Sequence, residues 1–153
     1  MNSNPIKPRE IGEIAIRCGD INIMTEFYRD SVGLEILSDM RKDGIVFFRI
    51  CAGFGGHTTI LALFLPNAGR PDLHPQATQA PYTGAASSLH HLALTVAWQE
   101  RGALREWFDQ HNITYRVQNF DWIGWEGTFI EDPEGNTIEF VAADLDHPAR
   151  NKE

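Results

Sequence analysis

The sequence has few cysteines and no long apolar run. Only Cys18 and Cys51 occur among its 153 residues, too few for the disulfide framework of a small secreted domain. No apolar stretch reaches the roughly 20 residues that a membrane-spanning helix needs. The opening residues, MNSNPIKPRE, lack the apolar segment that follows the charges of a secretory signal. We therefore expect a soluble protein of the reducing cytoplasm.

Positive charge is also scarce. The chain has 13 Lys and Arg against 21 Asp and Glu, for a formal net charge of −8. This balance argues against partners that bind through phosphate, so we expect neither nucleic acid nor an anionic membrane surface as a partner. Hydrophobic residues make up 42% and charged residues 22%, which is typical of a folded globular domain of this length.

The first half of the chain predicts a β-α-β-β-β order. Ile14 and Ile16 alternate with polar or small neighbours, which indicates a strand over 13–18. Asp20 is a suitable N-cap for a helix, and Gly33 is a suitable residue for its C-terminal end. Three strand-like runs follow, at 34–38, 45–51 and 58–65.

The same order then begins again. The pattern predicts a strand at 89–96, a helix at 98–111, and strands at 113–118, 125–131 and 137–141. Between the halves lies the stretch 66–88, which holds four of the eight prolines, as expected of a linker or surface excursion. We assign one domain at 10–144, with modules at 10–66 and 89–144, a linker at 67–88, and tails at 1–9 and 145–153.

Strand alternation selects three polar side chains. In the strand at 89–96, His90 is in phase with Leu92 and Leu94 on the helix-packed face, whereas His91 is in phase with Ala93. Glu13 and Glu139 also oppose their strands' apolar faces. If the two modules pair, these side chains converge in a cleft. One imidazole and two carboxylates suit Fe, Mn, Ni, Co or Zn, and three protein ligands leave positions for a substrate. The alternative for each residue is an ordinary surface Glu or a satisfied His.

Several segments resemble the vicinal oxygen chelate superfamily, which includes glyoxalase I, methylmalonyl-CoA epimerase, extradiol dioxygenases and the bleomycin- and fosfomycin-resistance proteins. The matching segments are Glu13-Ile-Ala-Ile-Arg with Asp20, Phe27-Tyr28-Arg29-Asp30, Gly33-Leu34, His91-Leu-Ala-Leu-Thr-Val and Asp132-Pro-Glu-Gly-Asn-Thr-Ile-Glu-Phe140. The resemblance implies an α+β fold of two βαβββ modules, whose mixed sheets form an open cup around a divalent metal with the helices outside. It also implies a homodimer.

By the same resemblance, Glu13, His91 and Glu139 fall on metal-ligand positions, and His91 and Glu139 become the candidate catalytic residues. A fourth family ligand falls within Ile60-Leu61-Ala62, where no side chain can coordinate a metal. This departure weakens an assignment to the glyoxalase I or epimerase chemistries. The resemblance also implies that extradiol dioxygenases have a histidine at the position that Glu13 occupies.

The sequence therefore leaves two functions open. The first is a metalloenzyme that chelates adjacent oxygens of a small-molecule substrate, with isomerase, lyase and oxygenase chemistry unresolved. The second is a non-catalytic protein that binds a small molecule or an antibiotic. Arg49, which the strand pattern places on one face with Cys51, is a candidate for holding an anionic substrate group. Trp122 and Trp125 are candidates for an apolar wall. For Arg49 the alternative is a surface salt bridge, and for the two tryptophans it is core or dimer packing.

Overall fold

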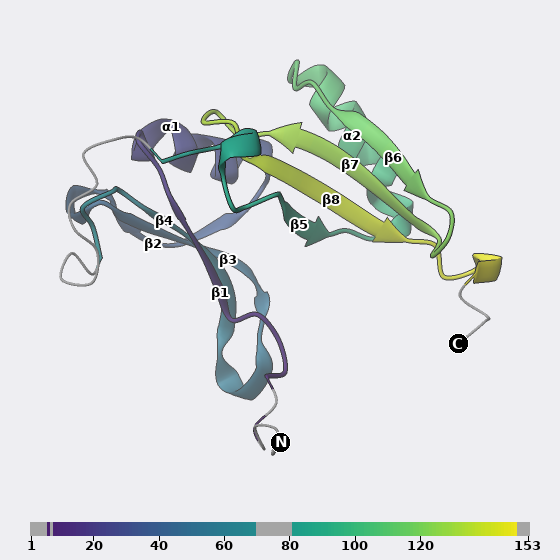
Figure 1. Cartoon of the computed structure of the whole chain (residues 1–153), viewed down its shortest axis with the longest axis horizontal. Coiled ribbons are helices and arrows are strands. Elements are labelled where there is room, and N and C mark those ends of the chain that lie inside the picture. Colours follow the sequence, from purple (N-terminus) through teal and green to yellow (C-terminus); the bar gives the residue numbers. More distant parts are fainter. Residues whose placement is uncertain (1–5, 7, 70–80, 150–153) are drawn as a thin grey trace. The chain divides into compact units, whose positions relative to one another are not determined.

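The computed structural model describes residues 6, 8–69 and 81–149. These residues form two compact units, Met1–Pro81 and Tyr82–Glu153, each with one four-stranded mixed sheet. Figure 1 labels their helices and strands. Each unit is described by itself below.

Unit 1 contains β1 (Glu13–Arg17), α1 (Ile21–Glu26), β2 (Glu35–Met40), β3 (Ile45–Ala52) and β4 (Thr58–Phe64). Asp20 caps α1 by accepting hydrogen bonds from the backbone N–H groups of Asn22 and Ile23. The helix continues as a wider π-helical turn at Phe27–Ser31. The strand order is β1-β4-β3-β2, in which β1 is parallel to β4 and the other pairs are antiparallel.

The core of unit 1 lies between α1 with its π-helical turn and one face of this sheet. Met24 and Tyr28 are fully buried, and the Tyr28 ring lies 6.0 Å from that of Phe48 on β3. Ile16 on β1 is also buried, whereas Glu13 is exposed. The predicted alternation of β1 is thus confirmed, because its isoleucines point toward the helix and Glu13 points away.

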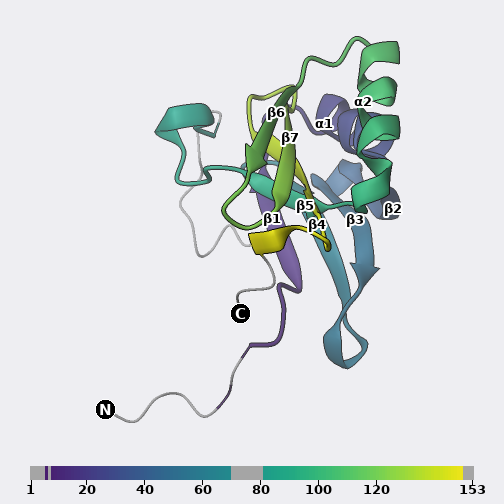
Figure 2. The ribbon, with the colours of Figure 1, turned by 90° about the vertical axis from the view of Figure 1, so that its right-hand side faces the viewer.

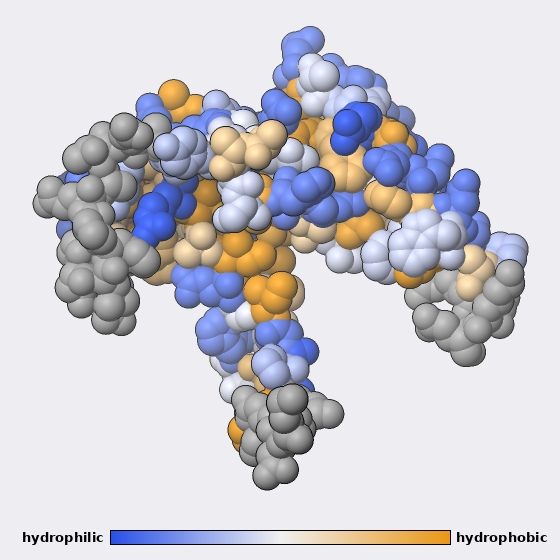
Figure 3. Space-filling model, viewed as in Figure 1, coloured by the Kyte–Doolittle hydropathy of each residue, from blue (hydrophilic) through white to orange (hydrophobic). Residues whose placement is uncertain are grey.

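Unit 2 repeats this arrangement with β5 (Leu92–Thr95), α2 (Arg101–Gln110), β6 (Arg116–Phe120), β7 (Trp125–Glu131) and β8 (Thr137–Ala143). The strand order is β5-β8-β7-β6, again with only the first pair parallel. α2 lies along one face of the sheet (Figures 1 and 2), where the buried Phe108 ring lies 5.5 Å from Phe140 of β8. In Figure 3 the surface over α2 and β6 is mostly hydrophilic, in agreement with exposed Glu106, Asp109 and Gln110.

The α+β prediction of two βαβββ modules is confirmed, but some strand limits differ. β5 begins at Leu92 rather than at 89, because its pairing with β8 starts at Leu92 and Ile138. β6 begins at Arg116 rather than at 113, because the chain first turns at Asn112, which has a positive φ of 55°. The backbone N–H of Ile113 then donates to the carbonyl of Phe108 and closes the end of α2.

A β-bulge changes one predicted face. Arg49 pairs with Ile60, but the next pair is Cys51 with Thr59, so Ile50 has no partner of its own. The sequence pattern placed Arg49 and Cys51 on one face. This expectation is wrong, since the extra residue shifts Cys51 out of phase with Arg49.

The predicted linker at 67–88 lies largely outside the described residues, which resume at Pro81. A short 3₁₀ turn at Gly84–Ala86 precedes β5. Among the described residues, no helix is long and apolar enough to cross a membrane.

Candidate functional site

The site centres on His91 and Glu139, both in unit 2. Glu139 lies in the middle of β8, and its side chain is only 8% exposed. His91 directly precedes β5, the strand parallel to β8, and its Nε2 lies 3.1 Å from Oε2 of Glu139. Both side chains therefore project from the face of the sheet opposite α2, as the strand phases predicted. This face is called the site face below and includes His91, Ala93, Arg116, Gly127, Phe129 and Glu139.

Gly127 of β7 provides the space for the Glu139 carboxylate. A Cβ atom built at position 127 would collide with Oε1 of Glu139, and it would lie 2.8 Å from Cε2 of Phe129. Gly127 has no positive φ, so its missing side chain matters for close approach rather than for backbone freedom. Because Gly127 has no side chain, the Glu139 carboxylate and the Phe129 ring can lie close to the backbone of β7.

His91 is held from its other ring nitrogen. Nδ1 of His90 and Nδ1 of His91 lie 2.7 Å apart, a contact in which one ring carries the proton and the other accepts it. If the Nε2–H of His91 donates to Glu139, a neutral His91 accepts from His90; if Nε2 binds an ion, the Nδ1–H of His91 donates to His90. In both states His90 orients the imidazole, as partners of metal-binding histidines commonly do.

The His91–Glu139 separation fits two ligands of one ion. Two donor atoms at about 2.0–2.2 Å from an ion, at an angle of 90–109°, lie about 2.8–3.6 Å apart. The observed 3.1 Å falls in this range, and imidazole nitrogen with carboxylate oxygen suits a first-row divalent metal. Within either unit, the described residues include no group of three or more His, Cys, Asp or Glu that could hold a metal ion. The pair alone therefore gives two of the ligands that such an ion needs.

The third predicted ligand, Glu13, lies in unit 1 at the start of β1, where it pairs with Ile60. The register of the two sheets identifies the position equivalent to Glu139. Glu139 pairs with Ala93 on β5, and Ala62 pairs with Ala15 on β1. Ala62 thus stands in module one where Glu139 stands in module two, and a methyl group cannot coordinate a metal.

The predicted substrate-binding residues fall in both units. In unit 1, Arg49 is exposed and pairs with Ile60 and with Glu35, so it lies in the same cross-strand row as Glu13. In unit 2, Trp125 is in phase with Gly127 on β7 and is 40% exposed, whereas Trp122 lies in the preceding turn and is 74% exposed. Among the described residues, the rings near His91 are those of His90 and Phe129, and neither tryptophan is one of them.

Glu126 is a buried carboxylate with a different role. It points to the opposite face of β7, toward α2, where Arg101 and Arg105 each donate to it at 2.6 Å. Arg101 also packs over the Trp98 ring, with Cζ 3.2 Å from the ring centre. The two arginines neutralise Glu126 and fix α2 to the sheet, so this carboxylate belongs to the fold and not to the site face.

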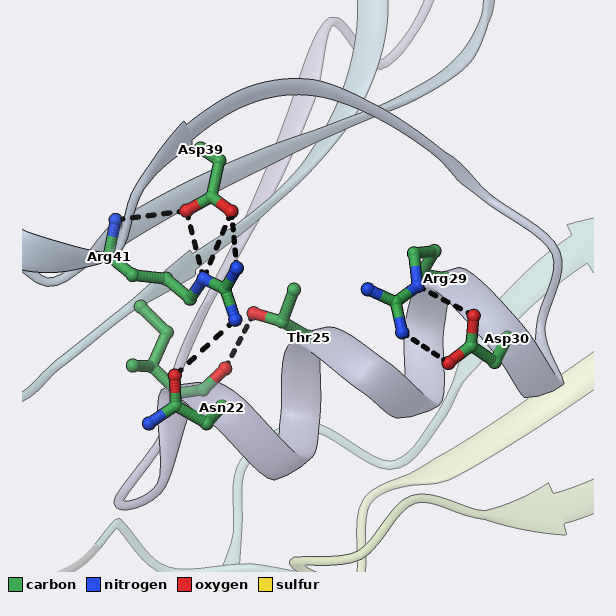
Figure 4. Close-up of polar contacts among 7 residues, drawn as sticks. Asn22, Thr25, Arg29, Asp30, Asp39 and Arg41 are labelled. Atoms are coloured by element: carbon green, nitrogen blue, oxygen red, sulfur yellow. Dashed lines mark hydrogen bonds and ion pairs between the residues drawn. The ribbon is translucent and has the colours of Figure 1, made fainter.

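The outer surface of unit 1 carries two ion pairs beside α1 (Figure 4). Arg41 donates to both carboxylate oxygens of Asp39 and lies 3.4 Å from Oδ1 of Asn22. Arg29 donates to Asp30 in the same manner. Hydrogen bonds from the guanidinium groups lower the pKa of Asp39 and that of Asp30 below their ordinary values. These pairs are solvated and help to hold the β2 turn and the helix end.

Sequence reasoning missed four residues of the site: His90, Arg116, Gly127 and Phe129. Alternation assigned His90 to the helix-packed face, and this was wrong, because His90 is exposed and its Nδ1 lies 2.7 Å from Nδ1 of His91. Gly127 had one usable signal, since a glycine inside a strand often marks a close approach. Nothing in the spacing singled out Phe129, whose ring lies 6.2 Å from that of His91.

Solved structures share this fold. Lactoylglutathione lyase from Agrobacterium tumefaciens is 22% identical, with a TM-score of 0.60 over 91% of this chain and 96% of that one. A glyoxalase/dioxygenase from Nostoc punctiforme is 21% identical, with a TM-score of 0.63 over 94% and 99%. An integron cassette protein from the Halifax Harbour sewage outfall metagenome is 15% identical, with a TM-score of 0.65 over 88% and 99%.

No curated protein matches the sequence significantly. A sequence model of one protein family, in contrast, matches residues 10–140, which include both modules and the His91–Glu139 pair. The chain belongs to the Glyoxalase/Bleomycin resistance protein/Dioxygenase superfamily.

Proposed function

We propose that this protein is a metalloenzyme that binds one divalent ion and acts on a small molecule with two adjacent oxygens. The observation that carries the proposal is the approach of His91 Nε2 to Glu139 Oε2 at 3.1 Å, on a face left uncovered by α2. A carboxylate with only 8% exposure is costly to bury without a cationic partner. A divalent ion beside His91 would provide that partner.

His91 and Glu139 would hold the ion, and Glu13 is the proposed third ligand. When bound, the ion supplies Lewis-acid stabilisation of negative charge on the substrate oxygens. His90 fixes the orientation of His91 through the Nδ1 contact. Oε2 of Glu139 faces His91, so Oε1, which lies over Gly127, is the atom proposed to receive a substrate proton. The proposal covers isomerase, lyase and oxygenase reactions alike.

Metal titration tests the proposal. The purified protein is stripped with a chelator and titrated by calorimetry with Zn²⁺, Mn²⁺, Co²⁺, Ni²⁺ and, anaerobically, Fe²⁺; Co²⁺ binding is also followed by its visible absorption. We expect one ion per chain and an affinity loss of at least about 10-fold in His91→Ala, Glu139→Gln and Glu13→Gln. His111→Ala is the matched control, because this histidine caps α2 and contacts Trp107. Wild-type protein that binds none of the five ions stoichiometrically would refute the proposal.

A second candidate function is the binding of a small molecule without metal or chemistry. The observation that favours it is Ala62, which removes one carboxylate that the repeat would otherwise place in module one. This candidate predicts that His91→Ala leaves ligand affinity unchanged, whereas the metalloenzyme predicts that affinity for a bidentate chelating ligand depends on both the ion and His91.

We also propose a homodimer, which light scattering at micromolar concentration tests.

A further inference from the structure

Arg116 lies on the site face at two strands' distance from Glu139. It pairs with Phe129 on β7, and Phe129 pairs with Glu139 on β8. The three residues therefore form one row across the sheet, with their side chains on the same face. Adjacent strands are about 4.8 Å apart, so the backbones of Arg116 and Glu139 are separated by about 10 Å.

Phe129 lies in the middle of this row, between Arg116 and Glu139. Its ring centre lies 6.2 Å from that of His91, at an interplanar angle of 77°. On the other side, Cζ of Arg116 lies 5.2 Å from the Phe129 ring centre. The guanidinium of Arg116 and the imidazole of His91 thus both lie near the Phe129 ring. The distance between these two groups cannot exceed the sum of their distances to the centre of that ring.

Arg116 also differs from the other arginines of its unit that surround the sheet. Arg101 and Arg105 are committed to Glu126. The contact recorded for Arg116 is with an aromatic ring, and the residues that the structure describes provide it with no carboxylate partner. Its side chain is exposed. A guanidinium that lies near a ring keeps its N–H groups available for a planar anion, which it can bind through two parallel hydrogen bonds.

We infer that Arg116 binds an anionic group of the substrate, most simply a carboxylate, while two adjacent oxygens at the other end of the substrate occupy the His91–Glu139 centre. The middle of the substrate then lies over Phe129, which favours a flat, apolar segment. This inference rests on the proposed function and names its substrate class: a flat molecule with a chelating oxygen pair at one end and a carboxylate at the other.

Two hydroxamates provide matched probes. Benzohydroxamate offers two adjacent oxygens on a flat ring, and 4-carboxybenzohydroxamate adds a carboxylate at the far end of the same ring. Their dissociation constants are measured by calorimetry with zinc-loaded wild-type protein, Arg116→Gln and Arg116→Lys. We expect wild-type protein to bind the carboxylated compound about 10- to 100-fold more tightly, the range for a hydrogen bond between charged groups.

The variants separate the guanidinium from general charge. Arg116→Gln should abolish the preference and leave benzohydroxamate affinity within about 2-fold of wild type, and Arg116→Lys should keep only part of it because an ammonium is not a planar fork. Arg29→Gln makes the same change of charge on the outer turn after α1, where Arg29 pairs with Asp30, and should keep the full preference. A preference that persists in Arg116→Gln would overturn the inference.

A second measurement distinguishes this inference from the metal proposal. Benzoate is titrated into the metal-free His91→Ala protein, and the Nε–Hε NMR signal of Arg116 is followed. The Arg116→Gln protein lacks this signal and so identifies it in the spectrum; a saturable shift of the signal with benzoate supports the anion site even if zinc does not bind. Zinc-dependent binding of benzohydroxamate without any carboxylate preference, and without a benzoate shift, would uphold the metal proposal and overturn the role of Arg116.

Discussion

Replacing Gly127 by alanine tests the geometry of the site most directly. The added Cβ would collide with Oε1 of Glu139 and would lie 2.8 and 3.0 Å from two ring carbons of Phe129. The carboxylate is the end of a flexible side chain and can move away, whereas the Phe129 ring lies between His91, at 6.2 Å, and Arg116, at 5.2 Å. We therefore expect Glu139 to lose its position beside His91 while the sheet remains intact.

The expected magnitudes differ for stability and for metal binding. Overpacking costs about 1–3 kcal/mol, and replacing a glycine inside a strand returns about 0.5–1 kcal/mol. The free energy of unfolding should therefore fall by about 1 kcal/mol, or about 2–4 °C in melting temperature for a chain of this length. Zinc affinity should fall about 10- to 100-fold, the range observed when groups that orient metal ligands are removed.

The control is Gly102→Ala on α2. A Cβ at position 102 meets no atom within 4 Å, and alanine in a helix is more stable than glycine by up to about 1 kcal/mol. We expect this variant to melt at a slightly higher temperature and to bind zinc as wild type does. Thermal unfolding by circular dichroism and zinc titration by calorimetry measure both quantities. Wild-type zinc affinity in Gly127→Ala would refute the role assigned to the space above Gly127.

Three further predictions concern other contacts. His90→Ala should lower zinc affinity about 10-fold without a change in the far-UV spectrum, because His91 loses the group that orients it; an unchanged affinity in calorimetry would contradict this. Glu126→Gln should lower the free energy of urea unfolding by up to about 3 kcal/mol, since Arg101 and Arg105 lose their shared anion, but should leave zinc affinity intact. Arg41→Gln should raise the pKa of Asp39, which Arg41 holds below its ordinary value. A carboxyl group whose pKa is lowered in the folded state stabilises the fold at pH values above its unfolded-state pKa. This stabilisation is lost as the pH falls through the folded-state pKa. The stability difference between wild type and Arg41→Gln should therefore shrink in acid, with the Asp39 titration followed by carbon NMR.

Much of the fold was predictable because its signals are local. Alternating Ile14 and Ile16, the Asp20 cap and the repeated element order depend on residues close together in the sequence, and the structure confirms each of them. The bulge after Arg49 was not predictable, because it depends on how β3 registers with β4 across the sheet. Local pattern thus identifies strands but not the irregularities that reassign a side chain such as Cys51 to the other face.

The candidate site was predictable only to the depth of strand phase. Phase brought His91 and Glu139 together correctly, because Glu139 pairs with Ala93 on β5 and His91 lies two residues before Ala93, directly ahead of that strand. The supporting residues required three-dimensional information: the space above Gly127 and the contact of Arg116 with Phe129 both cross from one strand to another. Such contacts are invisible in a single sequence, where Gly127 resembles any strand glycine and Arg116 any surface arginine.

The unequal modules support the proposal that His91 and Glu139 of unit 2 bind a ligand. Both sheets have the same strand order, so each offers an equivalent position beside the first strand. In unit 2 that position holds the carboxylate of Glu139, which fits because Gly127 has no side chain. In unit 1 it holds the methyl group of Ala62, which pairs with Phe47. A repeat that only needed to form a core would tolerate apolar residues at both positions. A buried carboxylate next to His91 costs folding free energy, and a ligand that it binds is the simplest reason for one module to carry it.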